Sequence, residues 1–558
     1  MEQKVLQLDK SFNRYIKLAT ACVEKDDLQG ALNFLLDAER FFSEPEVLAR
    51  IADVYADMGL LELSNKYWFK YMHSAPKERV KDAYEELAIN YFYLDNVWAS
   101  GYYFQKKLST DGFISKENID KEVLDFFSGE EYKKHAYRIV YPFNKADYTL
   151  ETKSAKRAIA LGAFSEAVKI LEKIPTECFT EELSGDYAIA LFMNDELDRA
   201  EQVCRNSIKA HGESVTAYCN LSTIYGMKKD VDKSGYYYRK ALSVSKGEQS
   251  EAYKIATCAI ERADHEKVRD CLEKILLERP YELSMRYFYG ICMMNLGNYQ
   301  KAVDTFKSAL MLDPSDMIVE YYYNYANSVL TSGVDKEKLL PLKYEKELPK
   351  KIASKWSKKI KEVMKNDQKI QPFTKNNENR KILRWGILYG DDTVMRASMF
   401  ILSYADKKFF FKTAQEILME QDVGAEVKRL LIYVLIMQGH KARTGVVAGT
   451  LYSCFSPKKL LSEKDCSGAL FVSAYALCVA RMLFFDLDSV DKIAKSADKV
   501  YLKLKDAVSE ADATNEELAA LMLSDCNFER YSGDKDVVKI FEISDRKLKK
   551  LKEMLNRS

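Results

Sequence analysis

Residues 283–316 constrain what this chain can fold into more tightly than any other stretch, because small residues, aromatic residues and a proline follow one another there at helix–turn–helix spacing. The residues that define the pattern are Gly290, Gly297, Tyr299, Ala302, Phe306, Ala309 and Pro314. Gly290 lets two helices approach closely, and Gly297 permits the turn between them. Phe306 fills the seam against a neighbouring unit, and Pro314 ends the second helix because it lacks an amide hydrogen. The stretch therefore predicts a helical hairpin.

Related patterns precede this stretch at similar intervals. The best of them covers residues 215–248, and the two prolines at 280 and 314 are separated by one repeat length of 34 residues. Weaker copies occupy residues 12–44, 45–78, 81–112, 148–176, 181–214 and 249–282. Five of the ten prolines fall on the boundaries of these units, namely Pro45, Pro76, Pro175, Pro280 and Pro314. The chain is therefore expected to stack helical hairpins, each of which contacts its neighbours.

These spacings resemble those of the tetratricopeptide repeat family, whose unit is a helix–turn–helix of 34 residues. The resemblance implies an all-α fold, with a right-handed solenoid of helix pairs followed by a further helical-repeat region. It also implies that the first helix of each unit lines a concave surface, where partners usually lie as an extended peptide or a helix.

The pattern divides the chain into five segments. They are an N-terminal repeat array (1–112), an irregular connector (113–147), a central repeat array (148–332), a lysine-rich helical hinge (333–378) and a C-terminal helical region (379–558). The connector could equally be an irregular repeat. The start of the C-terminal region is similar to a HEAT unit, with Asp391 and Asp392 expected to cap a helix, Val394 and Ala397 to face the core, and Arg396 to face out.

The hinge contains an amphipathic helix, LPKKIASKWSKKIKEVM, at residues 348–364. Its apolar residues recur every three to four positions and form one stripe, made of Leu348, Ile352, Trp356, Ile360 and Val363. Lysines cover the rest of its circumference. Such a helix either lies on an anionic surface or bridges two parts of the protein with its stripe packed and its lysines solvated. We favour the bridging interpretation.

The resemblance also selects the residues that would line the concave groove of the central array. They are Phe192, Met193, Met227, Tyr253, Tyr287, Ile291, Met294, Tyr321 and Tyr325. Aromatic and methionine side chains adapt to apolar peptides and contribute much of the energy at interfaces. The alternative is that a later segment of the same chain fills this groove.

The composition excludes several other classes of function. The formal net charge is +1, so no overall field favours nucleic acid or an acidic membrane, and neither is expected as a partner. No histidine or cysteine pair has metal-ligand spacing, and no phosphate-binding loop or nucleophile-elbow motif occurs. We therefore expect no enzyme, no cofactor, no metal and no small-molecule substrate.

The cysteines indicate a reducing compartment. The eleven are an odd number, scattered along the chain, and most lie on apolar helical faces, so we expect free thiols and a cytoplasmic protein. The N-terminus carries charges where an export signal needs an apolar core. The best membrane candidate, residues 467–480, is too short to span about 30 Å of hydrocarbon.

These observations predict a non-enzymatic scaffold or adaptor that binds a protein or peptide in the concave groove. A chaperone-tail receptor is disfavoured, because the comparable positions of the first units carry no cationic clamp. Two alternatives stay open. One is a peptide-responsive bacterial regulator, which fits our expectation of a bacterial source, although such regulators often begin with a DNA-binding module. The other is binding of an anionic surface or nucleic acid through the lysine-rich hinge.

Overall fold

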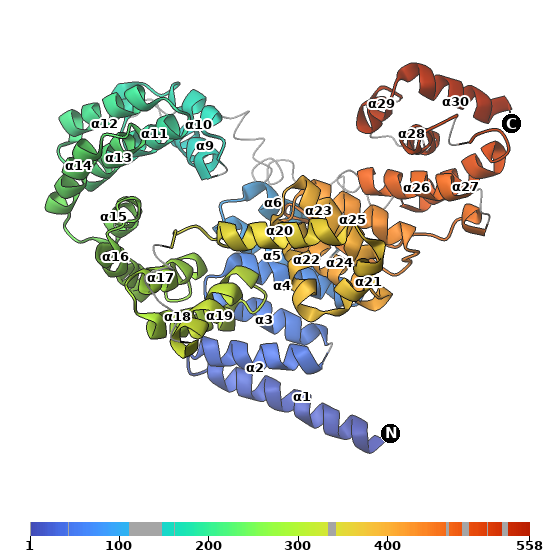
Figure 1. The fold of residues 1–558 in the computed structure, drawn as a ribbon, viewed down its shortest axis with the longest axis horizontal. Helices are drawn as coiled ribbons and strands as arrows, with labels where there is room; N and C mark the ends of the chain where they lie inside the picture. Colours follow the sequence, from blue (N-terminus) through green and yellow to red (C-terminus); the bar gives the residue numbers. More distant parts are fainter. Residues whose placement is uncertain are drawn as a thin grey trace.

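The computed structural model describes residues 2–42, 44–110, 148–160, 162–332, 342–464, 468–482, 490–509, 512–526 and 534–557. The expected connector, 113–147, lies outside the described residues, as does the start of the hinge. Helices packed in antiparallel pairs make up almost all of the described chain (Figure 1). The prediction of an all-α solenoid is confirmed.

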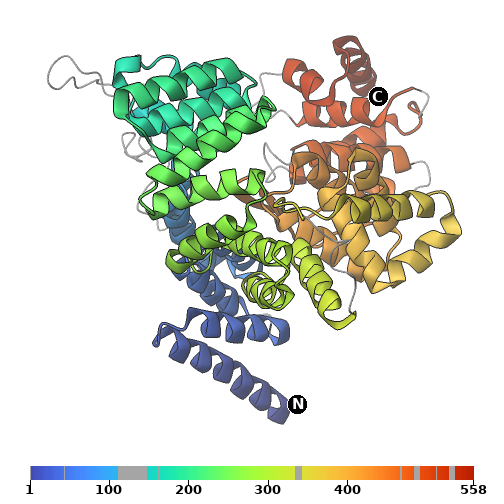
Figure 2. The same cartoon turned by 60° about the vertical axis from the view of Figure 1, so that its left-hand side comes forward.

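The N-terminal array consists of three helical hairpins and a 3-10 turn, Lys77–Arg79. Its helices are α1 (Glu2–Val23), α2 (Leu28–Phe41), α3 (Pro45–Asp57), α4 (Leu61–Ser74), α5 (Val80–Tyr93) and α6 (Val97–Thr110). Pro45 begins α3 at a position where its missing amide hydrogen costs nothing. Helix α1 projects away from the rest of the molecule in both views (Figures 1 and 2).

The central array continues the same construction and curves into an arc (Figure 1). Its helices are α9 (Thr149–Ala160), α10 (Phe164–Leu171), α11 (Glu181–Met193), α12 (Leu197–His211), α13 (Val215–Met227), α14 (Val231–Val244), α15 (Gln249–Glu261), α16 (His265–Glu278), α17 (Leu283–Asn295), α18 (Tyr299–Leu312) and α19 (Met317–Ser332), with a 3-10 turn at Thr176–Cys178. Gly290 lies where a Cβ atom would come within 2.4 Å of the Phe306 ring, so the expected close helix crossing is present.

Each turn between the paired helices of the central array contains a residue with left-handed backbone geometry. These residues are Gly162, Asp195, Lys229, Ala263 and Gly297, with φ between 54° and 76°. In three of these turns the residue directly after it, Asp230, Asp264 or Asn298, caps the following helix, and Asn298 does so by accepting a hydrogen bond from the Lys301 amide at 3.1 Å. The repeat is therefore regular in backbone conformation even where its turn lacks glycine.

An irregular segment, residues 342–349, and thirteen further elements complete the described chain. They are α20 (Lys350–Val363), α21 (Asp367–Lys375), α22 (Asn377–Tyr389), α23 (Asp392–Ser403), α24 (Lys407–Met419), α25 (Ala425–Met437), β1 (Thr444–Ala448), β2 (Leu451–Phe455), α26 (Ala469–Met482), α27 (Val490–Leu504), α28 (Asn515–Asp525), α29 (Asp534–Phe541) and α30 (Asp545–Arg557), plus a 3-10 turn at Leu461–Lys464. As expected, Asp391 caps α23 by accepting from the Val394 amide at 2.8 Å. Val394 and Ala397 are buried, and Arg396 is exposed and pairs with Asp392.

The stripe of the hinge helix packs inside the molecule. The Trp356 ring meets the Trp385 ring of α22 edge to face, with centroids 5.5 Å apart, and Ile360 and Val363 are buried. Lys350, Lys351, Lys355 and Lys358 remain exposed. The geometry is that of a helix bridging the central array and the C-terminal region.

The β-hairpin formed by β1 and β2 was not predicted, and it links the C-terminal region to the N-terminal array. The strands pair antiparallel from Thr444 opposite Phe455 to Ala448 opposite Leu451. Tyr103 of α6 donates a hydrogen bond to the Thr450 carbonyl at the hairpin turn, at 2.7 Å. A second contact joins the N-terminal array to the central array: the Tyr55 hydroxyl of α3 donates a hydrogen bond to the Leu312 carbonyl of α18 at 2.6 Å. The N-terminal array thus packs against both later parts of the chain.

Candidate functional site

The first helices of the central repeats (α11, α13, α15, α17 and α19) carry the residues that the sequence selected as lining a candidate groove. They pack closely at its upstream end, where a Cβ atom on Gly185 of α11 would come within 2.6 Å of Thr216 of α13. Polar pairs lie along this upstream end, such as Lys156 with Glu182 at 2.6 Å and Lys254 donating to Thr216 at 2.5 Å. This part of the groove has a polar wall beside its apolar residues.

At the downstream end of these helices lies an irregular, bent segment of the chain itself, residues 342–348, which we call the strap. Asn295, the last residue of α17, exchanges two hydrogen bonds with the backbone of Leu342. Its Nδ2 donates to the Leu342 carbonyl at 2.9 Å, and its Oδ1 accepts from the Leu342 amide at 2.8 Å. The Tyr287 hydroxyl donates to the Glu345 carbonyl at 2.8 Å, and the Tyr322 hydroxyl donates to the Glu347 carbonyl at 3.1 Å. The groove therefore holds the strap largely by its main chain.

Side chains of the strap add a smaller set of contacts. The Tyr344 hydroxyl shares a hydrogen bond with Nδ1 of His265, at 2.8 Å. Lys346 pairs with Asp316 at 2.6 Å, and Leu348 is buried. Lys343, Glu345 and Glu347 are exposed, so they add little to the fit. One aromatic and one aliphatic side chain thus complement the backbone contacts.

The structure divides the selected groove residues into three groups. Tyr287, Ile291 and Met294 are fully buried at the strap-bearing end, so an added partner does not reach them while the strap is in place. Tyr321 and Tyr325 are half-buried on α19, and their rings stack with centroids 6.1 Å apart.

The remaining selected residues lie upstream on α11, α13 and α15. Phe192 is buried and Tyr253 is half-buried, whereas Met193 and Met227 are 49% and 42% exposed. The upstream residues that stay accessible are therefore the two methionines and part of the tyrosine ring.

Sequence reasoning missed the polar residues that hold the strap. Asn295 directly follows Met294 in the apolar run ICMMNLG. A polar amide side chain next to the selected residues was the sequence feature that could have indicated its binding role. Tyr322 and His265 gave no such signal, because their role depends on where the strap lies.

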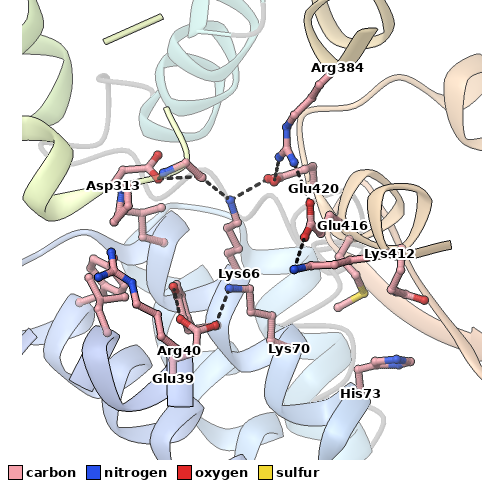
Figure 3. Close-up of a pocket in the computed structure, with 18 residues that line it drawn as sticks. Glu39, Arg40, Lys66, Lys70, His73, Asp313, Arg384, Lys412, Glu416 and Glu420 are labelled. Atoms are coloured by element: carbon pink, nitrogen blue, oxygen red, sulfur yellow. Dashed lines mark hydrogen bonds and ion pairs between the residues drawn. The ribbon is translucent and has the colours of Figure 1, made fainter. Parts of the chain in front are cut away.

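A cavity of about 660 Å³ opens where the N-terminal array, the end of α18 and the C-terminal region meet (Figure 3). Charged side chains from all three parts line it, and one of their ion pairs, Lys66 with Glu420, crosses the junction between the N-terminal array and the C-terminal region, whereas two further pairs each lie within one part. Lys66 of α4 contacts Glu420 at 2.9 Å, Lys70 contacts Glu39 at 3.0 Å, and Arg384 of α22 contacts Glu416 at 2.8 Å.

Burial lowers the pKa of His73, another residue of this lining, so its imidazole stays neutral at neutral pH. Most of the charged side chains that line this cavity pair with other lining residues. The cavity therefore has the character of an interface between parts of the protein.

No group of three or more histidine, cysteine, aspartate or glutamate side chains within the described ranges has the arrangement of a metal site. None of the helices in the same ranges is long and apolar enough to cross a membrane.

Two segments of the central array match the tetratricopeptide repeat family, residues 215–247 and 283–316. They correspond to the hairpins α13–α14 and α17–α18. A search of curated proteins finds no match to the sequence.

Several solved structures resemble part of the chain. YrrB, described as a tetratricopeptide repeat protein with an unusual peptide-binding site, is 11% identical and aligns over 34% of this chain and 98% of its own, with a TM-score of 0.24. A tetratricopeptide repeat protein from Parabacteroides merdae is 13% identical over 57% of this chain and 99% of its own, with a TM-score of 0.22. The C-terminal part of a repeat-containing protein from Cytophaga hutchinsonii is 14% identical over 50% and 98%, with a TM-score of 0.26. At these values the solved structures say nothing about what this chain binds.

Proposed function

We propose that this tetratricopeptide repeat protein is a non-enzymatic scaffold whose central array binds an extended segment of a partner protein along its concave groove. Binding would involve the selected residues Phe192, Met193, Met227, Tyr253, Tyr287, Ile291, Met294, Tyr321 and Tyr325. The strap is the single observation that carries this proposal, because it is a non-helical peptide segment bound through its backbone by first helices of the central array. A cytoplasmic location is part of the proposal and is supported by the free cysteines of the described chain.

The contacts of the strap explain how such a groove could accept a peptide. Asn295 and the tyrosines at 287 and 322 contact backbone atoms, which every peptide offers. Side-chain preference would come from the places that hold Tyr344 and Leu348. A partner segment with an aromatic residue followed four positions later by an aliphatic residue would reproduce both.

The upstream groove would accommodate a longer partner. Met193 and Met227 are exposed there, and flexible thioether side chains adapt to apolar surfaces of different shape. The strap would then serve as an internal competitor at the downstream end, with the high effective concentration that tethering gives.

A peptide supplied in trans tests the proposal. Residues 342–348 are replaced by a glycine–serine segment of equal length, and a labelled peptide LKYEKELP is titrated while its fluorescence anisotropy is measured. We expect saturable binding to this variant and binding at least about tenfold weaker to the intact protein, because the tethered strap competes.

Two matched controls accompany that titration. The same peptide with alanine in place of its tyrosine should bind more weakly, and adding Asn295→Ala to the variant should reduce binding of the original peptide. A folded variant that binds neither peptide would contradict the proposal.

A further inference from the structure

The N-terminal array presents a second concave face with a different chemistry. It is formed by Asp53 and Asp57 on α3 and by Glu86, Ile89, Phe92 and Tyr93 on α5, and we call it the acidic face. Asp53 and Asp57 are one helical turn apart, and Glu86, Ile89 and Tyr93 recur at spacings of three and four on α5. Glu86 interacts electrostatically with Asp57, and Asp53 with Glu86, which places the two helices side by side at this face.

The repeat register assigns these residues to the concave side. Asp57 and Tyr93 each lie two positions before the left-handed turn residue of their hairpin, Gly59 and Asp95. Asn295 stands at the same place, two positions before Gly297, and it binds the strap. By the same count, Asp53 and Ile89 correspond to Ile291. The acidic face is therefore the N-terminal counterpart of the strap-bearing groove.

Large apolar side chains are exposed on this face. Ile89, Phe92 and Tyr93 are 44%, 55% and 73% exposed, and the two rings pack edge to face with centroids 5.8 Å apart. The core residues of the same helix, such as Leu87 and Tyr91, are buried, so the exposure belongs to one side of α5. Grouped exposed apolar residues of this kind mark interaction surfaces.

Among the described residues, no ion pair joins a cation to Asp53, Asp57 or Glu86. Two cations act on these carboxylates electrostatically, Arg50 on Asp53 and Lys107 on Glu86, but Arg50 pairs with Glu46 at 3.1 Å and Lys107 pairs with Glu85. Desolvation, with Glu86 and Asp57 adding to it, raises the pKa of Asp53 to about 6. Desolvation also raises the pKa of Asp57 and of Glu86. Placing like charges together costs stability, and such an arrangement is typical of sites that bind a partner of opposite charge.

We propose that the acidic face docks a basic amphipathic segment of a partner protein, with lysine or arginine side chains on the carboxylates and apolar side chains on Ile89, Phe92 and Tyr93. The charge of the face selects this occupant over nucleic acid and over anionic lipid, which the carboxylates repel. The inference is independent of the proposed peptide groove, since it concerns another array and another ligand chemistry.

Two labelled probes of defined sequence test the inference with the full-length protein. One is an amphipathic peptide of lysine and leucine, and the other carries glutamate in place of every lysine. We expect the lysine peptide to bind and the glutamate peptide to bind at least about tenfold more weakly, with the affinity of the lysine peptide falling as salt is added.

Surface variants then locate the binding. A triple variant that combines Asp53→Asn, Asp57→Asn and Glu86→Gln should bind the lysine peptide at least about tenfold more weakly than the natural chain does. The control neutralises three exposed acids of the central array with Glu166→Gln, Glu177→Gln and Asp232→Asn, and it should leave the affinity within about twofold, since its charges are distant and screened.

Apolar variants complete the test. Phe92→Ala with Tyr93→Ala should weaken binding of the lysine peptide. Val231→Ala with Leu277→Ala, which truncates two apolar side chains elsewhere that are as a pair even more exposed, should not. All four positions are exposed, so the variants are expected to fold, and circular dichroism checks this. Equal binding of the two peptides, or equal losses in the acidic-face and control variants, would overturn the inference.

Discussion

The side-chain amide of Asn295 and the backbone of Leu342 are joined by two hydrogen bonds, of 2.9 and 2.8 Å, although 47 positions separate them in the sequence. An amide that pairs with both backbone groups of one residue binds a peptide backbone without reading its sequence. This relationship makes the downstream groove of the central array a place where a peptide is held.

Removing that amide should loosen the strap. Asn295→Ala leaves the amide and carbonyl of Leu342 without their protein partners, and we expect the loss of about 1 kcal/mol in the free energy of unfolding. Hydrogen exchange in residues 342–348 should become faster, because their anchor is gone. Asn327→Ala, an exposed asparagine on α19, is the control and should change neither quantity. Unchanged exchange in the Asn295 variant would show that the side-chain contacts of the strap suffice to hold it.

The close crossing of α17 and α18 should tolerate no side chain. In Gly290→Ala the new methyl group would lie 2.4 Å from a Phe306 ring carbon, and overpacking of this kind costs about 1–3 kcal/mol. Gly424→Ala is the matched control, because nothing lies within 4 Å of its Cβ position. Urea unfolding measures both variants, and equal stabilities would contradict the repeat register.

The local parts of the fold were predictable from the sequence for a physical reason. Gly290 and Phe306 meet within one hairpin, and Pro314 ends that hairpin, so their roles follow from spacings inside 34 residues. The cap at Asp391 likewise followed from its neighbours in the sequence.

The parts that could not be predicted depend on contacts between distant segments. Tyr103 meets Thr450 across 347 positions, and no local pattern announces that contact. The position of the strap could not be predicted from the sequence for the same reason. Tyr287 was therefore compatible both with an accessible groove residue and with a buried residue that contacts the strap. The β-hairpin was missed because its strands are only five residues each, within a region of helical periodicity.

Introducing glycine at Ala263 and removing glycine at Gly297 should change the stability of the protein in opposite directions. Ala263 has φ of 54° and Gly297 has φ of 76°, and a side chain in this left-handed region costs about 1 kcal/mol. We therefore expect Ala263→Gly to raise the free energy of unfolding and Gly297→Ala to lower it. Thermal unfolding of the pair checks both signs, and a shift of the same sign in both variants would refute the turn geometry.

The acidic face predicts a dependence of stability on pH. The pKa of Asp53 is raised to about 6 from its ordinary value by desolvation and by Glu86 and Asp57, with Arg50 opposing them. The folded state then binds more protons than the unfolded state between about pH 4 and about pH 6, so this residue's contribution falls as the pH rises through that window.

Asp53→Asn should accordingly raise the free energy of unfolding at about pH 7 and leave it nearly unchanged at about pH 4. Asp232→Asn, at an exposed acid of α14, provides the reference in the same urea titrations. A variant that is less stable than the natural chain at about pH 7 would mean that the carboxylate of Asp53 is favourably paired in solution.

Photo-crosslinking tests the central claim most directly, because it locates a bound peptide on the protein. The peptide LKYEKELP is made with a photoreactive residue at the position of Tyr344 and added to the variant whose strap is replaced by glycine and serine. Mass spectrometry of the products should place the crosslinks on α16 and α17, near His265 and Cys292, beside which the Tyr344 ring lies in the intact chain. Crosslinks confined to the outer helices α12 and α14, or spread evenly over the surface, would contradict the account.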